Sequence, residues 1–327
     1  MKKNAFMLDA GIDVPLICGA MYPCSNPELV AAVSKAGGLG IVQPVSMIFA
    51  HGHELRDGIK FIRAITRKPI GFNALVEKSY PRYEKRMRQW VDIALEEEIK
   101  FFVTALGKPE WVVEKVHAAG GVVYHDVTEG KWAKKALDSG VDGLICVNDR
   151  AGGHAGALST EKLYKEVSRF GVPLICAGGI SDERGFIKAL ETGYSGVQMG
   201  TRFIATSECN SHDDYKEAIL QAVETDIVLT EKITGLPVSV IRTPYVEKQG
   251  VKAGPLARRL LRRNSSRKWM RMIYTLRSIF RLRKASQKGK VYMEYFQAGK
   301  SVDGISSVRP ASEIVKSFAK AAVAVGK

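Results

Sequence analysis

The sequence has 327 residues, 46% of them hydrophobic and 25% charged, a balance that is typical of globular proteins and excludes a wholly disordered chain. No apolar run approaches the roughly 20 residues that a membrane-spanning helix needs, and Asp9 and Asp13 interrupt the N-terminal apolar stretch before a secretory signal forms. We therefore expect a cytoplasmic protein. Its net charge of +15 is concentrated in one segment, because residues 247–290 hold fifteen Lys and Arg against one acidic residue.

Short apolar runs rich in Val and Ile recur along the chain up to residue 199. These predicted strands are residues 16–18, 39–42, 70–72, 101–103, 122–124, 143–147, 174–176 and 196–199. Segments with helical spacing separate them, at residues 27–36, 83–97, 110–118, 131–137, 161–167 and 183–190. Continuous apolar strands are typical of parallel sheets covered by helices, and eight of them predict an α/β fold of the (β/α)8 TIM barrel type. A doubly wound open sheet would carry GxGxxG after its first strand, and residues 19–22 do not supply it.

The chain after the eighth predicted strand does not continue the repeat. We expect a barrel over residues 1–208 and a partly helical cap or lid over residues 209–327, whose last helix packs back on the barrel. Between residues 269 and 284, apolar side chains fall at helical spacing and basic ones occupy the remaining surface, which predicts a basic amphipathic helix.

This helix has a conservative interpretation as a lid or homodimer element with its arginines in water. The alternatives are docking of an acidic protein, or of an anionic membrane surface, to residues 252–290. One basic helix without a recognised nucleic-acid-binding fold supplies charge but no sequence readout, which argues against a nucleic-acid partner.

Two glycine-containing loops follow the seventh and eighth predicted strands. Gly178 and Gly179 come after residues 174–176, and residues 198–201 read Gln-Met-Gly-Thr. In barrels this pair of loops commonly forms a phosphate site, since glycine lets backbone N–H groups approach the anion and a helix N-terminus adds favourable partial charge. One such loop indicates only a tight turn, whereas two on consecutive strands predict a bound phosphate, of a cofactor or of a substrate.

The loop after the sixth predicted strand carries a histidine flanked by glycines, in the order Gly152, Gly153, His154, Ala155, Gly156. Barrel active sites are built from loops at this end of the strands. An imidazole whose pKa is near neutrality serves as a base or as a hydrogen-bond donor to a developing anion. His154 is therefore the candidate catalytic residue. The five cysteines show no CxxC spacing, and no metal site is predicted.

Residues 151–156, 177–180 and 198–201 together resemble the motifs of the nitronate monooxygenase (2-nitropropane dioxygenase) family, whose barrel is related to that of the FMN-dependent enoyl-acyl carrier protein reductases. Residues 15–21 resemble the family's opening strand and residues 71–73 its third strand, so that the similarity covers residues 10–245. The resemblance implies bound FMN. It places the flavin against Ala20, Met21 and Asn73, with Gly152 and Gly153 near the ring, and the ribityl and phosphate groups among Gly178, Gly179, Gln198, Met199, Gly200 and Thr201.

Two positions depart from the family pattern. The family often has glutamate where Arg150 stands and glutamine where Val147 stands, while the acid here is Asp149 and the amide Asn148. Arg150 either favours an anionic substrate or is a solvated loop charge. His125, at the end of the fifth predicted strand, is expected to support the flavin.

The activity that the resemblance implies is oxidation of alkyl nitronates with O2, in which His154 holds the anionic nitro group. The alternatives are an NAD(P)H-dependent flavin reductase acting on an enoyl thioester or quinone, and a flavin- or partner-binding paralogue without turnover. A barrel without flavin that resembles inosine-monophosphate dehydrogenase would need a cysteine after the sixth strand, and residues 148–158 contain none.

Overall fold

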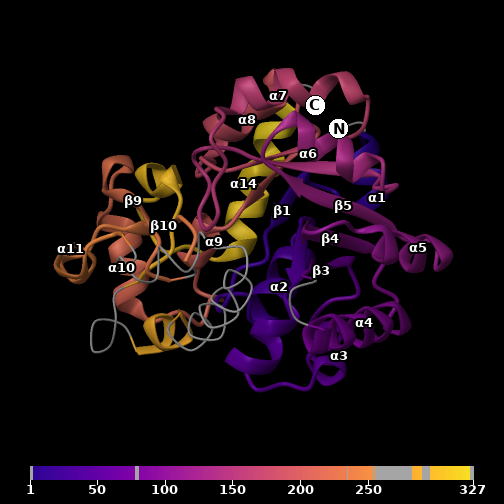
Figure 1. Cartoon of the computed structure of the whole chain (residues 1–327), viewed down its shortest axis with the longest axis horizontal. Coiled ribbons are helices and arrows are strands. Elements are labelled where there is room, and N and C mark those ends of the chain that lie inside the picture. Colours follow the sequence, from indigo (N-terminus) through magenta and orange to yellow (C-terminus); the bar gives the residue numbers. More distant parts are fainter. Residues whose placement is uncertain are drawn as a thin grey trace.

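The computed structural model describes residues 3–77, 81–233, 235–252, 254, 282–288 and 295–324. Eight parallel strands follow one another around a closed barrel, and β8 pairs with β1 to complete it (Figure 1). The predicted TIM barrel is thereby confirmed. The strands are β1 (Leu16–Cys18), β2 (Leu39–Val42), β3 (Ile70–Val76), β4 (Phe101–Leu106), β5 (Val122–Val127), β6 (Gly143–Val147), β7 (Leu174–Ala177) and β8 (Gly196–Met199).

Helices follow the strands and cover the outside of the barrel. They are α2 (Pro27–Lys35), α3 (Leu55–Ile65), α4 (Pro81–Glu96), α5 (Glu110–Ala118), α6 (Gly130–Leu137), α7 (Thr160–Val167) and α8 (Glu183–Thr192). Side chains cap two of them, since Ser159 accepts from Lys162 N at the start of α7 and Asp182 accepts from Gly185 N at the start of α8. The sequence patterns gave no prediction for α3 or for the short π-helix η1 (Ser46–Ala50) that precedes it.

The N-terminal end of the barrel is closed by an apolar plug. Alternate residues of the strands point inward, and they form one cluster with α1 (Ala5–Ala10), which lies across that end. Phe6 of α1 is fully buried, with its ring 6.0 Å from that of Phe101 and 5.8 Å from that of Tyr124. The other strand residues pack against the helices in a larger outer cluster. A ligand can therefore enter the barrel only from the C-terminal ends of the strands.

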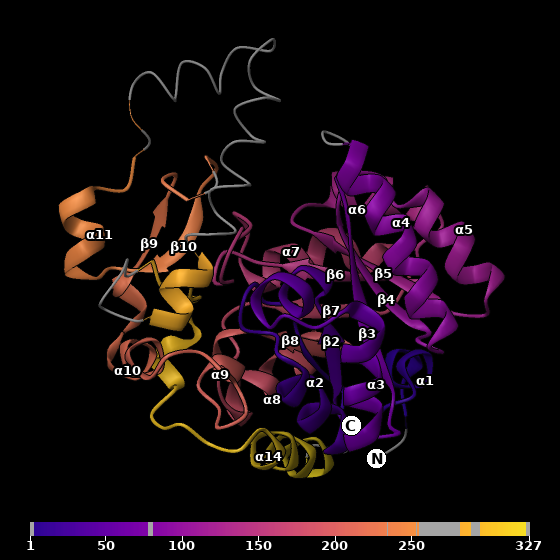
Figure 2. The same ribbon diagram turned by 90° about the horizontal axis from the view of Figure 1, so that it is seen from below.

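The cap, which we define as the described residues between 209 and 305, lies to one side of the barrel in Figure 1 and in Figure 2. Its own small core combines the β9–β10 hairpin with α11 and the helical residues 282–288. After the cap, α14 returns to the barrel and packs against α2 and α8. The elements are α9 (Thr201–Ile204), α10 (Asp213–Gln221), η3 (Glu224–Asp226), β9 (Ile227–Thr230), β10 (Val238–Ile241), α11 (Pro244–Gln249), η5 (Lys300–Gly304) and α14 (Ala311–Ala324).

Most of the basic segment at residues 252–290 lies outside the described residues, and so does the greater part of the predicted amphipathic helix. The division of the chain at residue 208 stays a prediction. Across the parts of the chain that the structure describes, no helix has both the length and the apolar character that crossing a membrane requires.

Candidate functional site

The loop after β1 lies against the end of β8. Gly19 N donates to Met199 O over 3.0 Å, and a Cβ placed on Gly19 would lie 3.0 Å from Gln198 Cγ. A Cβ on Gly200 would likewise lie 3.3 Å from Met21 Sδ. The small residues at these positions therefore allow two predicted flavin-binding segments, far apart in the sequence, to meet.

Asn148 clamps the loop after β6 to the loop after β7. Its side chain is fully buried, donates to Gly178 O over 3.0 Å and to Thr160 Oγ1 over 2.9 Å, and accepts from Arg150 N over 2.9 Å. Gly178 has φ +118°, and a Cβ there would lie 2.2 Å from Asn148 Oδ1. Only glycine fits this backbone and this space. The sequence marks Asn148 as the amide of this loop, but no local pattern shows that it joins the two loops.

His154 lies on a part of the β6 loop that is tied to the cap. Gly153, which has φ +68°, accepts through its carbonyl from Ser239 N of β10 over 2.8 Å, and Gly156 N donates to Asn148 O over 3.1 Å. The His154 side chain borders open space, yet the surrounding protein desolvates it and lowers its pKa below the usual value for histidine. The imidazole is therefore neutral near pH 7, with one ring nitrogen that donates and one that accepts.

A segment of the cap closes over the same loop. Thr201 Oγ1 accepts from Gly299 N over 3.0 Å, and Lys300 N donates to Arg150 O over 2.9 Å. A Cβ on Gly299 would lie 2.6 Å from Gly152 N, so glycine is needed for the two backbones to touch. Gly299 is not among the site residues predicted from the sequence.

Arg150 forms a two-pronged ion pair with Glu224 of the cap, at 2.8 Å for both nitrogens. The Arg150 guanidinium is the main reason why the pKa of Glu224 lies below its usual range. The Arg150 side chain also lies across Gly179, where a Cβ would be 2.6 Å from Nε. Because Arg150 is paired with Glu224, it is neither an unpaired charge in solvent nor available in this pair to bind a substrate anion. Neither expectation for Arg150 describes this arrangement.

Polar side chains face the barrel interior above the apolar plug. Asn73 alternates with the outward-facing Phe72 and Ala74, so its side chain points inward, where it is 6% exposed. No hydrogen bond of the Asn73 amide to another described residue is present in the structure. Gln198 lies beside Gly19, and Ala20 packs against the inner cluster. Asn73 and Ala20, two of the predicted ring-binding residues, thus both lie on the inner side of the barrel.

Comparison of the whole sequence with known protein families agrees with the barrel and its loops. A sequence model of nitronate monooxygenases matches residues 4–320. The chain belongs to the nitronate monooxygenase family. It is therefore an oxidoreductase of a family whose members depend on flavin.

Three similar proteins illustrate the range of this family's relatives. The (3aS,4S,5R,7aS)-5-hydroxy-7a-methyl-1-oxo-octahydro-1H-indene-4-carboxyl-CoA dehydrogenase of Mycobacterium tuberculosis is 33% identical over 274 residues, which cover 80% of this chain and 75% of the relative. A protein of Staphylococcus saprophyticus with the name "Probable nitronate monooxygenase" is 29% identical, with 72% of this chain and 78% of that protein covered. The structure of FabK from Thermotoga maritima is similar over 100% of this chain and 98% of that one, with a TM-score of 0.81 and 28% identity.

The residues of this nitronate monooxygenase family member fit a phosphorylated flavin. The backbone N–H groups of Gly179 and Thr201 donate to no backbone acceptor among the described residues, and Thr201 begins α9, where a helix leaves its first amides unpaired. Since Thr201 Oγ1 accepts from Gly299 N, its hydroxyl hydrogen remains for a further acceptor. These donors suit phosphate oxygens.

Two predicted residues face away from the space. The Met199 side chain is 2% exposed and packs in the outer cluster, so only its backbone lies at the site. His125 also lies on the outer face of β5, where its Nδ1 forms a hydrogen bond with Thr104 Oγ1 over 2.8 Å. Burial lowers the pKa of His125 to about 4. His125 cannot contact a ligand inside the barrel directly.

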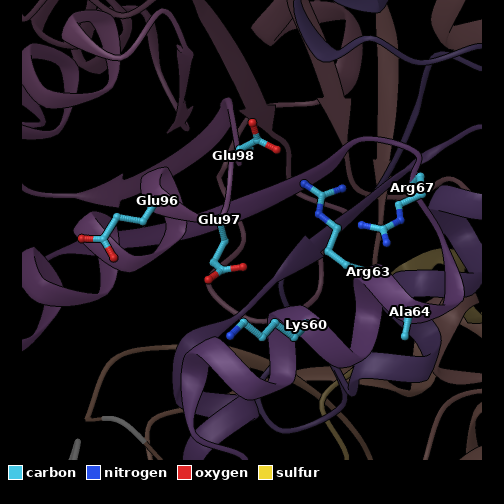
Figure 3. A pocket seen from close by; sticks show the side chains of 7 residues that line it. All are labelled: Lys60, Arg63, Ala64, Arg67, Glu96, Glu97 and Glu98. Carbon is cyan, nitrogen blue, oxygen red and sulfur yellow. The ribbon is translucent and has the colours of Figure 1, made fainter.

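A separate pocket of about 460 Å³ lies between α3 and α4 (Figure 3). Its lining comes from the C-terminal parts of these two helices and the residues just after them, which lead into β3 and β4. The pocket therefore lies toward the N-terminal ends of the strands, whereas barrel enzymes hold their substrates at the other end. It contains none of the predicted site residues. The lining residues are Lys60, Arg63, Ala64, Arg67, Glu96, Glu97 and Glu98.

Proposed function

We propose that this protein is an FMN-dependent oxidoreductase whose leading activity is the oxidation of alkyl nitronates with O2. The observation that carries the proposal is the Asn148 clamp, because it joins the histidine loop and the glycine loop after β7 into one unit. A histidine and a set of phosphate-binding amides are held together in this way at the open end of the barrel.

The flavin would be held along the space between these loops. We assign the phosphate and ribityl groups to a set of residues that offers backbone amides, a hydroxyl and an amide side chain, and the ring to a set that lines the inner space. The first set is Gly178, Gly179, Gln198, Met199, Gly200 and Thr201, and the second is Ala20, Met21, Asn73, Gly152 and Gly153. When bound, FMN supplies the group that accepts electrons from the substrate.

His154 is the proposed catalytic residue. A nitronate carries its negative charge on two oxygens next to the carbon that gives up electrons. A neutral imidazole can donate one hydrogen bond to such an oxygen without transferring its proton, and a fixed donor of this kind contributes most where water is excluded. The cap segment fixes the β6 loop beside His154 through its contacts with Arg150 O and Thr201 Oγ1.

A second candidate activity is oxidoreduction of an acyl or enoyl thioester with NAD(P)H as the partner in electron transfer. It is supported by the 33% identity to a protein whose name is that of a carboxyl-CoA dehydrogenase. His154 would serve the same purpose there, since electron transfer next to a thioester places negative charge on the carbonyl oxygen. A paralogue that binds flavin without turnover remains the alternative of another class.

One experiment separates these three functions. FMN-loaded protein is mixed without oxygen with a propyl nitronate, with NADPH, or with saturated and enoyl-CoA esters, and flavin absorbance is followed. Bleaching by the nitronate alone supports the leading activity. Bleaching by NADPH or by a saturated thioester, with the colour restored by an enoyl-CoA ester, supports the second, and no bleaching by any of them supports the paralogue without turnover. We expect His154→Asn to lower kcat/KM by roughly 100- to 1000-fold while FMN stays bound. Protein that cannot bind added FMN contradicts the proposal, and a variant with unchanged rates excludes His154 from catalysis.

A further inference from the structure

A carboxyl group at the end of β5 has no assigned role. Asp126 follows Tyr124 by two residues, so the alternation of the strand places its side chain on the inner face of the barrel, above the plug. Asp126 Oδ1 is buried and has no hydrogen-bond partner among the described residues. The residue as a whole keeps partial exposure.

The surroundings of Asp126 do not stabilise a negative charge. Burial alone raises the pKa of this carboxyl to about 7. The inward positions of the two neighbouring strands carry no titratable side chain: on β4 and β6 they are Phe101, Val103, Ala105, Gly143, Ile145 and Val147. On the adjoining strands and the loop after β6, the titratable and charged groups are Tyr124 and His125 on its own strand, Cys146 on β6, and Asp149, Arg150 and His154 on that loop. The His125 side chain points to the opposite face of the sheet. Of these, the one fixed cation is Arg150, which is paired with Glu224.

Two buried polar residues close to Asp126 do have partners. Asn148 uses both ends of its amide, and His125, next to Asp126 in sequence, is bonded to Thr104 on the opposite face of the sheet. A buried acid without a partner costs free energy, and such exceptions in folded proteins call for an explanation. The unpaired acid is explained if a ligand offers an acceptor atom to the neutral carboxyl group.

We propose that Asp126 binds the flavin as a neutral hydrogen-bond donor on the floor of the site, across β4 from Asn73. The inference rests on the proposed flavin function and adds to it. The pyrimidine edge of an isoalloxazine ring presents carbonyl oxygens and a ring nitrogen as acceptors and one N–H as a donor. A carboxylic acid supplies one O–H, and the Asn73 amide supplies donors and an acceptor. An ionised Asp126 would repel the same acceptor atoms, so FMN binding requires the proton on Asp126.

The test is the pH dependence of FMN binding to FMN-free full-length protein, measured by quenching of flavin fluorescence from pH 5.5 to pH 9. For the wild type we expect Kd to rise by up to about tenfold per pH unit above pH 7, and at least about tenfold in all, because ionised Asp126 must take up a proton. Asp126→Asn keeps a donor without a charge, so its Kd is low and flat. Asp126→Ala, which loses the donor, binds weakly at every pH.

The FMN phosphate titrates near pH 6, and this contribution is common to all variants, so their difference isolates Asp126. Asp138→Asn is the matched control, because Asp138 is an exposed partner of Lys134 on α6 and the variant should follow the wild type. A wild-type Kd that changes less than about twofold, or an Asp126→Asn profile with the wild-type slope, overturns the inference while flavin binding stands. Absence of FMN binding at every pH contradicts the proposed function as well.

A second measurement needs no flavin. Asp126 holds its proton more tightly in the folded protein than in the unfolded chain, so its stabilising contribution is complete below the unfolded pKa of about 4 and is lost as pH rises through 7. We expect the ratio of folded to unfolded wild-type protein to fall about a hundredfold relative to Asp126→Asn between pH 5 and pH 8.5. A constant ratio over this range would show that Asp126 is not a desolvated acid and would refute the donor assignment.

Discussion

The two ends of the barrel are built from opposite kinds of residue. At the N-terminal end, Phe6, Phe101 and Tyr124 interlock, and the one polar group among them, the Tyr124 hydroxyl, donates to Asp9 over 2.8 Å. At the C-terminal end, Asn73 and Asp126 point inward without partners among the described residues. The first end is complete without a ligand, whereas the second carries polar groups that a ligand would satisfy.

This difference shows where stability and function reside in the same eight strands. Burial of the plug stabilises the fold, whereas positive-φ glycines and unpaired polar groups at the other end lower stability in return for a site. Substitutions at the plug should therefore change the free energy of unfolding but not ligand binding by the folded molecules. Substitutions in the loops should change ligand binding, whether or not they also change the free energy of unfolding.

The largest expected effect is that of Phe6→Ala. Phe6 is fully buried against two aromatic rings, so its truncation removes apolar burial and leaves a cavity. We expect the free energy of unfolding to fall by about 3–5 kcal/mol, measured by urea denaturation. FMN affinity of the folded protein should change by less than about twofold, because α1 lies at the far end of the barrel from the site.

Leu8→Ala is the control on the same helix, since Leu8 is 66% exposed. Its free energy of unfolding should stay within about 0.5 kcal/mol of the wild type. Equal losses for the two variants, or a loss of FMN affinity with Phe6→Ala, would mean that the two ends of the barrel are not independent.

The next effect in size is that of Gly178→Ala. The new methyl group meets Asn148 Oδ1 at 2.2 Å on a backbone with φ +118°, so the clamp between the β6 and β7 loops must open. We expect a loss of about 2–4 kcal/mol of stability from backbone strain and the broken hydrogen bond together. FMN affinity should fall by more than tenfold, measured by fluorescence titration.

Gly171→Ala separates strain from contact. Gly171 also has a positive φ, +70°, but a methyl group there meets nothing within 4 Å. This variant should lose only about 1 kcal/mol and should keep its FMN affinity. If both variants bind FMN equally well, the clamp does not support the site.

The barrel could be predicted from the sequence because each buried strand is a short apolar run. Eight such runs with helical segments between them are compatible with few other folds. The glycine loops could be placed because they follow those runs directly. Helix α3 was not predicted although Leu55, Ile59 and Ile62 have helical spacing, because its N-cap residue Glu54 makes no side-chain cap and the helix carries many charges. The six-residue α1 is too short to give a periodic signal.

The contacts that shape the site depend on tertiary structure and could not be predicted in this way. An asparagine after a strand indicates a turn, and nothing local shows that Asn148 reaches Gly178. The partner of Arg150 is 74 residues away, so its charge had no visible counterpart. His125 and Asp126 are adjacent, and which of them faces the interior is fixed by strand register, which the sequence does not reveal at a strand end.

The smallest effect is expected for Glu224→Gln. This variant tests whether the ion pair between the cap and Arg150 affects stability and substrate binding at the C-terminal end of the barrel. The Arg150–Glu224 pair has good two-pronged geometry, but both side chains are 36% exposed. Solvent screening therefore limits the loss of stability to about 1 kcal/mol or less, and salt should diminish it further. The freed Arg150 should increase the affinity for an anionic substrate, seen as a lower KM with little change in kcat. If KM stays constant while stability falls by more than about 2 kcal/mol, Arg150 acts as a structural strut of the β6 loop and not as a charge held back from the substrate.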